Sequence, residues 1–176
     1  MKLLQANRGD RLVLGLLKKL FLVMAAAYVA LPAHALPGPL SEQELMEKSD
    51  IVALIRVLSV TCTSVTTDER TGEELPGYLA RLQVVESKKG DAKKGDEVLV
   101  TWRAVPRDVD GPWAVFYYPG EEVWTHLTLR SGGVTYASTW WNAKGEDVKA
   151  PDTRDLPLTP GQTVVPRPEP QEQTPL

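Results

Sequence analysis

The run Ile51-Val52-Ala53-Leu54-Ile55-Arg56-Val57-Leu58-Ser59-Val60 decides the fold class, because it is rich in β-branched residues and almost wholly apolar. A short apolar run of this kind predicts a central strand that the rest of the chain covers on both faces. Residues 61–77 are mostly polar, and charged residues and a glycine gather at 68–74. We therefore expect a hairpin-like excursion after the strand, with its tip at 68–74.

Period-2 alternation predicts the further strands. Every second side chain from Tyr78 to Val84 is apolar, whereas Arg81 and Gln83 lie on the other face. This pattern is typical of a half-buried strand, here over 78–86. Similar patterns predict strands over Glu97–Arg103, 122–130 and 134–141, and a short edge strand over 113–116.

One short helix should precede the first strand. Ser41 is followed three residues later by Glu44, which matches a capping box and predicts a helix over Glu42–Lys48. Five or six strands without a βαβ rhythm indicate an all-β fold with antiparallel pairing. We expect a small five- to six-stranded barrel of the OB kind, because closure removes exposed strand edges. Whether the barrel closes or stays an open sandwich is left open here.

The chain divides into four parts. Residues 41–149 carry the strand patterns, and 36–40 form a proline-containing linker before them. Seven of the last 26 residues are proline, so we expect a disordered, Pro-rich tail over 150–176.

Residues 1–35 have the three parts of a secretory signal peptide. Five basic residues precede an apolar run at 20–31, and Ala33-His34-Ala35 supplies the small residues of a cleavage site. The run is shorter than the roughly 20 residues that span a bilayer, so we expect cleavage after Ala35 and no stable membrane insertion afterwards. The expected location is the bacterial periplasm or exterior.

Charge and cysteine content exclude several classes. Residues 36–176 carry 15 basic and 22 acidic side chains, a net charge of −7 that argues against a nucleic-acid partner. Cys62 is the only cysteine, so an internal disulfide is excluded. Secreted eukaryotic domains of this size usually contain several disulfides, so this content favours a bacterial exported protein. We expect Cys62 to be a buried small hydrophobe, with an intermolecular disulfide as the alternative.

A family resemblance rests on the order of these elements. A short helix leads into Ser49-Asp50-Ile51-Val52-Ala53-Leu54-Ile55-Arg56-Val57, Lys94-Gly95-Asp96 precedes a strand, and Tyr118-Pro119-Gly120-Glu121 precedes another. Over 49–136 this order resembles the OB barrel of netrin-like domains, of tissue inhibitors of metalloproteinases and of their bacterial exported relatives. The resemblance implies the fold. The inhibitors act through an N-terminal cysteine that chelates the protease zinc, and the expected mature start here is Leu36-Pro37, so that activity is not carried over.

No motif for catalysis, a metal or a cofactor is present in the sequence. After signal removal, His126 is the one histidine, and it cannot form a zinc site with Cys62 alone. Nothing around Cys62 resembles a catalytic cysteine loop, so a Cys62–His126 pair is disfavoured. Paired carboxylates at Asp108 and Asp110 are the basis for the remaining enzyme alternative, a hydrolase of unknown specificity. We expect no enzyme and no cofactor.

Aromatic residues gather in the second half of the domain and supply the candidate binding surface. Exposed rigid aromatics are favoured at interfaces because they bury a large area at low entropy cost. We expect a non-enzymatic interaction module that contacts an extracytoplasmic protein, with a carbohydrate-binding protein as the alternative. The candidate residues are Trp124, Trp141, Tyr117 and Tyr118, with His126 and Arg130 as polar neighbours that face solvent.

Overall fold

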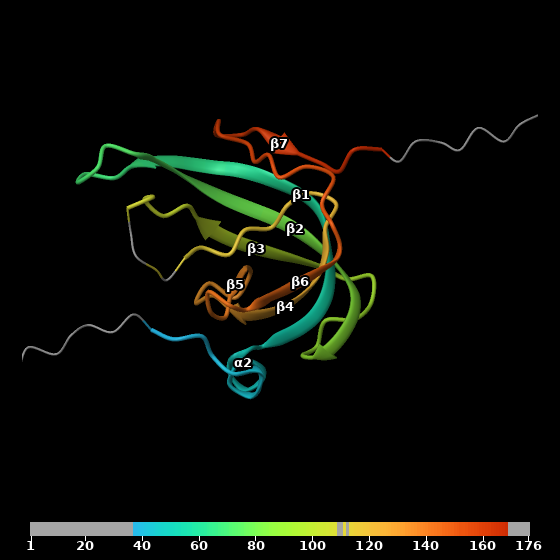
Figure 1. The fold of residues 1–176 in the computed structure, drawn as a ribbon. Coiled ribbons are helices and arrows are strands. Elements are labelled where there is room, and N and C mark those ends of the chain that lie inside the picture. Colours follow the sequence, from blue (N-terminus) through green and yellow to red (C-terminus); the bar gives the residue numbers. More distant parts are fainter. Residues whose placement is uncertain (1–36, 109–110, 112, 169–176) are drawn as a thin grey trace, which may run out of the picture. The chain divides into compact units, whose positions relative to one another are not determined.

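The computed structural model describes residues 37–108, 111 and 113–168, which lie in one compact unit. The signal peptide expected at 1–35 and the last eight residues lie outside this part. The described elements are α2 (Glu42–Lys48), β1 (Ile51–Thr67), β2 (Glu74–Lys89), β3 (Glu97–Arg103), β4 (Glu122–Leu129), β5 (Tyr136–Ser138), β6 (Lys144–Lys149) and β7 (Thr163–Val164) (Figure 1).

The long hairpin of β1 and β2 forms the frame of the fold. The two strands pair antiparallel from Val52 opposite Lys89 to Thr67 opposite Glu74, as the polar excursion at 61–77 predicted. Side chains of the alternating set from Tyr78 to Val84 are buried, which confirms the predicted face of β2. Register shifts interrupt the pairing at four places, and such bulges let long strands curve around a core.

The sheet closes on itself into a five-stranded barrel. β1 pairs with β2 and, over its first six residues, also with β4. β3 and β5 meet in parallel at Val100 and Tyr136, which gives the closed order β1-β2-β3-β5-β4. The small barrel of the OB kind predicted from the sequence is confirmed, except that the β3–β5 pairing is parallel where antiparallel pairing was expected. β6 and β7 are additional strands, paired with β4 and β1.

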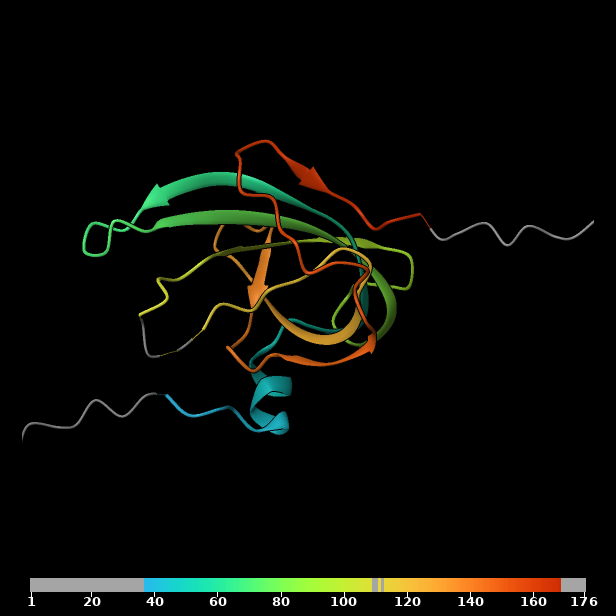
Figure 2. The same cartoon turned by 45° about the horizontal axis from the view of Figure 1, so that its top comes forward.

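The helix α2 has the bounds expected from the sequence, and the predicted capping box is present at its start. The Glu44 amide donates to the Ser41 side chain at 3.3 Å, and the Ser41 amide donates to the Glu44 carboxylate at 2.9 Å. Leu45 is the buried residue of the helix, and it fixes α2 beside the start of β1. Figures 1 and 2 show α2 and β7 on opposite sides of the barrel.

The structure corrects three expectations. Residues 113–116 form no strand, and the strand expected over 134–141 shortens to β5 because the chain turns at 139–142. The segment from 150 to 168 is not a disordered tail, since β7 pairs with β1 at Val60 and Thr61. The backbone of Cys62 continues this contact: its amide donates to Gln162 and its carbonyl accepts from Gly161.

A buried ion pair ties the segment before β4 to the barrel. The Glu121 side chain is fully buried, and Lys144 Nζ lies 2.7 Å from one of its oxygens. Lys144 also donates to the Phe116 carbonyl at 2.8 Å, while the Tyr118 amide donates to the Glu121 carboxylate at 2.8 Å. Burial raises the pKa of Glu121, although Lys144 and the Tyr118 amide act in the opposite direction. This pair therefore fixes the path of residues 116–121.

Candidate functional site

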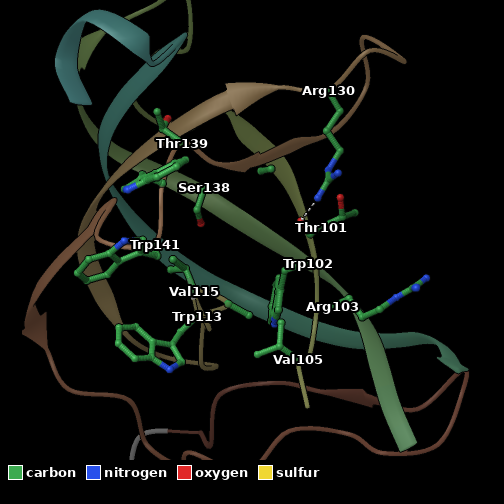
Figure 3. Close-up of a pocket in the computed structure, with 13 residues that line it drawn as sticks. Thr101, Trp102, Arg103, Val105, Trp113, Val115, Arg130, Ser138, Thr139 and Trp141 are labelled. Atoms are coloured by element: carbon green, nitrogen blue, oxygen red, sulfur yellow. Dashed lines mark hydrogen bonds between the residues drawn. The ribbon is translucent and has the colours of Figure 1, made fainter. Parts of the chain in front are cut away.

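An open cleft of about 300 Å³ lies where β3 and β5 separate. Its walls are the end of β3, Val105, the segment 113–115, Arg130 and residues 137–141 (Figure 3). Four of the five tryptophans of the chain line it: Trp102, Trp113, Trp140 and Trp141. We call this site the tryptophan cleft.

Two tryptophans form an aromatic corner on one side of the cleft. The rings of Trp113 and Trp141 meet edge to face, with centroids 5.5 Å apart and an interplanar angle of 89°. Trp113 is 56% exposed, so much of its ring is available to a ligand. Figure 3 shows this corner on one side and Trp102 on the other.

Trp102 connects the cleft to the core. Its ring lies 5.2 Å from that of Tyr78 and 5.6 Å from that of Tyr117, measured between centroids. Its indole Nε1 is buried and, among the described residues, has no hydrogen-bond partner. The half-buried Trp102 is therefore a rigid wall that packing, rather than hydrogen bonding, holds in place.

The turn at 139–142 is tied to the linker that precedes α2. Trp140 Nε1 donates to the Gly38 carbonyl at 3.0 Å, and Trp141 Nε1 donates to the Pro37 carbonyl at 3.2 Å. Asn142 exchanges two hydrogen bonds with the backbone of Leu40. In the strand expected over 134–141, the adjacent Trp140 and Trp141 would point to opposite faces. The chain turns here instead, so both side chains are half-buried and both donate to the linker.

The end of β3 presents unpaired backbone groups to the cleft. The Ala104 amide donates to the Pro76 carbonyl, so in an antiparallel ladder the N–H and C=O of Trp102 also face β2. Backbone groups alternate in direction along a strand, so the N–H and C=O of Thr101 and Arg103 face away from β2, towards β5. Arg130 Nη2 donates to the Thr101 carbonyl at 2.8 Å. Apart from the sheet pairings, no backbone hydrogen bond among the described residues involves Arg103, and β3 pairs with β5 at Val100 and Tyr136, three residues before it.

The charge of the cleft differs from that of the domain. Among the described residues, Arg103 and Arg130 are the charged members of its lining, and none of the others there is a carboxylate. Figure 3 shows the Arg103 side chain extending away from the tryptophans, whereas that of Arg130 reaches down to Thr101. The tryptophan cleft is thus locally basic on a chain that is acidic overall.

The structure separates the six predicted site residues. Trp141 and Arg130 line the tryptophan cleft, whereas Trp124 and His126 line a second pocket beside α2. Tyr118 is half-buried, and the cations of Lys144 and Arg154 each lie 5.3 Å from its ring centroid. Its ring therefore already has cationic neighbours from the chain itself.

Two of these expectations are corrected. Tyr117 is fully buried, and its hydroxyl lies 2.6 Å from that of Thr125 and 3.0 Å from that of Ser138. Burial raises the pKa of Tyr117 to about 12, so this residue is a neutral core phenol and not part of a binding surface. His126 is only 6% exposed, because β6 and the turn before it cover this part of β4.

Sequence reasoning did not single out Trp102, Trp113 or Trp140 as site residues. In the expected strands, Trp102 shares the phase of the apolar Val98 and Val100, and Trp140 that of Val134 and Tyr136, which favours core positions for both. Trp113 belongs to the edge strand expected over 113–116, which does not form. The available signal was the proline and glycine content of 106–112, which indicates a loop that can present a nearby aromatic side chain.

Of the two carboxylates on which the hydrolase alternative depends, Asp108 is paired with an arginine. Both oxygens of Asp108 accept from Arg70, at 2.7 and 2.9 Å, and these hydrogen bonds lower the pKa of Asp108. A lowered pKa is the reverse of what a general acid needs. Asp110 lies outside the described residues. In the described part of the chain, no group of three or more His, Cys, Asp or Glu side chains is placed to hold a metal.

Comparison with protein families, curated proteins and solved structures finds no match to this chain. The function has to be argued from the site, since a barrel of this kind supports many activities. No helix among residues 37–168 that the structure describes is long and apolar enough to cross a bilayer.

Proposed function

We propose that this chain is an exported, non-enzymatic binding module whose tryptophan cleft binds an extended peptide segment of an extracytoplasmic partner protein. One observation carries the proposal: the unpaired backbone edge at Arg103 lies beside the aromatic corner of Trp113 and Trp141. A free edge binds an added strand through main-chain hydrogen bonds, and neighbouring pockets select its side chains.

The lining of the cleft defines the peptide. A bound strand pairs with the N–H and C=O of Arg103, and one of its side chains enters between the aromatic corner and Trp102. That side chain is apolar or aromatic, because the walls there are indole rings and Val115. Arg103 and Arg130 are the charged side chains among the described residues of the lining, and two cations there favour an acidic residue next to that apolar side chain.

A glycan is the second candidate for the same cleft. The exposed ring of Trp113 offers a flat stacking platform, and the Thr101 side chain offers a hydroxyl at the cleft wall. A glycan would use the ring faces and side-chain hydroxyls. It would not need the backbone edge of β3, and this difference separates the two candidates.

The test is a selection from a displayed random-peptide library against the chain from Leu36 to Leu176, alongside a glycan array. We compare Trp113→Ala with Leu158→Ala, a matched control that removes an exposed apolar side chain outside the cleft. Arg103→Pro removes the free N–H, while Arg103→Ala keeps it. A proline here removes no pairing to β2, because this N–H faces away from β2.

We expect selected peptides to combine an apolar or aromatic residue with an acidic one. Their binding should be lost in Trp113→Ala and Arg103→Pro and retained in Leu158→Ala. Arg103→Ala keeps the N–H but removes one of the two cations, so it should only weaken the binding. Peptides that bind all four variants alike would refute the site. Glycan binding that requires Trp113 and tolerates Arg103→Pro would replace the peptide by a carbohydrate.

A further inference from the structure

A second pocket, of about 240 Å³, lies between α2 and the barrel wall. Residues from α2, β1, β2, β4 and the 142–145 segment line it, and it shares no residue with the tryptophan cleft. Leu45, Val52 and Ala143 supply a buried apolar floor, at 3%, 1% and 1% exposure. We call it the α2 pocket.

His126 brings an unused acceptor to this pocket. Its side chain is only 8% exposed, and its Nδ1 lies 3.2 Å from the Ala143 carbonyl oxygen. A carbonyl oxygen can only accept, so in the neutral ring Nδ1 carries the proton and Nε2 has the lone pair. Nε2 is buried and has no hydrogen-bond partner among the described residues. An unpaired buried polar atom is costly, and a ligand that donates to it would remove that cost.

The groups around Nε2 favour a cationic donor. The Glu42 carboxylate, on a largely exposed side chain at the rim, has Oε1 only 3.5 Å from Nε2. The indole ring of Trp124 adds a negative π face, over which Lys88 Nζ lies 3.8 Å from the centroid. The chain's own Lys88 thus shows that an ammonium group fits this ring. The amide of Asn142 is already used by the backbone of Leu40.

We propose that the α2 pocket binds a protonated alkyl amine, with its ammonium group donating to His126 Nε2 and to the Glu42 carboxylate. Its alkyl chain lies against Leu45 and Val52, and the amine replaces Lys88 at the Trp124 ring. The amine belongs either to a lysine side chain or to a free alkyl diamine, since both have the same terminal chemistry. This site is independent of the peptide site proposed for the tryptophan cleft.

The test uses NMR on the ¹⁵N-labelled chain from Leu36 to Leu176, in which His126 is the one histidine and gives unique imidazole signals. The probes are n-butylamine, 1-butanol and butyrate, three molecules of similar size that differ in charge. We expect n-butylamine to shift the His126 Nε2 and Trp124 indole signals in a saturable way, and the other two to leave them unchanged. Saturable shifts with 1-butanol or butyrate of equal affinity would overturn the assignment to a cation.

Variants at the rim test the contacts without disturbing the core. Lys88→Ala frees the Trp124 ring and should tighten n-butylamine binding about 2- to 5-fold, whereas Lys94→Ala in an exposed turn should change nothing. Glu42→Gln should weaken it about threefold. Unchanged affinity in both Lys88→Ala and Glu42→Gln would overturn the proposal. Comparison of N-acetyl-lysine methylamide with 1,5-diaminopentane then assigns the amine to a lysine side chain or to a free diamine.

Discussion

Replacing Lys144 with methionine removes the cation that pairs with the buried carboxylate of Glu121. The methionine keeps the length of the side chain, so the change isolates the charge and its two hydrogen bonds, at 2.7 Å to Glu121 and 2.8 Å to the Phe116 carbonyl. Removing one partner of a buried ion pair leaves the other charge uncompensated, at a cost of about 3–5 kcal/mol. Since 15% of the Lys144 side chain remains exposed, we expect the lower end, about 3 kcal/mol.

The assay is urea unfolding at pH 8 and at pH 5, with Lys94→Met as the exposed control. Burial already raises the pKa of Glu121 above its ordinary value of 4.5, and loss of the cation raises it further. A carboxyl group whose pKa is raised by folding stabilises the protein at pH values below its ordinary pKa, and this stabilisation is lost as pH rises through the pKa of the folded state. The cost of Lys144→Met should therefore be larger at pH 8 than at pH 5. At pH 8 the thermal midpoint should fall by roughly 10 °C.

A double-mutant cycle provides the control for the mechanism. In a Glu121→Gln background no buried carboxylate is left without its cation. Lys144→Met should therefore lower the free energy of unfolding much less there than in the wild type. A cost under about 1 kcal/mol that does not change with pH would refute the argument, because it would mean that water solvates the carboxylate.

Two further substitutions test the packing of the barrel. Gly90→Ala should lower the free energy of unfolding by about 3 kcal/mol, because the new Cβ would collide with the Asp50 carbonyl oxygen and the residue has φ +95°. Gly95→Ala is the control, since Gly95 has φ +94° but open space around it, and it should cost about 1 kcal/mol. Equal costs of the two substitutions in denaturant unfolding would contradict the collision. Tyr117→Phe should cost about 1–2 kcal/mol at pH 8, because it breaks two buried hydrogen bonds. Because the pKa of Tyr117 is raised to about 12 in the folded protein, the wild type loses stability as pH rises above the ordinary tyrosine pKa of 10. The difference in unfolding free energy between the wild type and Tyr117→Phe should therefore shrink by about 1 kcal/mol near pH 11. A difference that does not change between pH 8 and pH 11 would be inconsistent with the raised pKa.

Side-chain patterns predicted the elements whose stability comes from side chains. The buried face from Tyr78 to Val84 follows from alternation, and the start of α2 follows from the pair of Ser41 and Glu44. β7 gave no such signal, because it consists of two residues held by backbone bonds in a proline-rich segment. β6 was missed because its exposed charged residues hide the two half-buried positions at Lys144 and Asp147.

The candidate site was predictable in part. The turn at 139–142 and the backbone edge at Arg103 depend on how β3 and β5 separate, which no local pattern encodes. Tyr117 and Tyr118 are adjacent in a segment that forms no strand, so no periodic pattern says which of them enters the core. Three-dimensional packing settles this, since the Tyr117 hydroxyl finds two partners on β4 and β5.

The segment that follows β6 protects a strand edge. The far half of β1 has β2 on one side, and on its other side β7 pairs with Val60 and Thr61, while Gly161 and Gln162 bond Cys62. Without these residues, the extended and half-buried far part of β1 would present free N–H and C=O groups to other molecules. Such edges template intermolecular β pairing and aggregation. We therefore expect that shortening the chain to residue 150 exposes this edge and yields a protein that self-associates, which sedimentation velocity would detect.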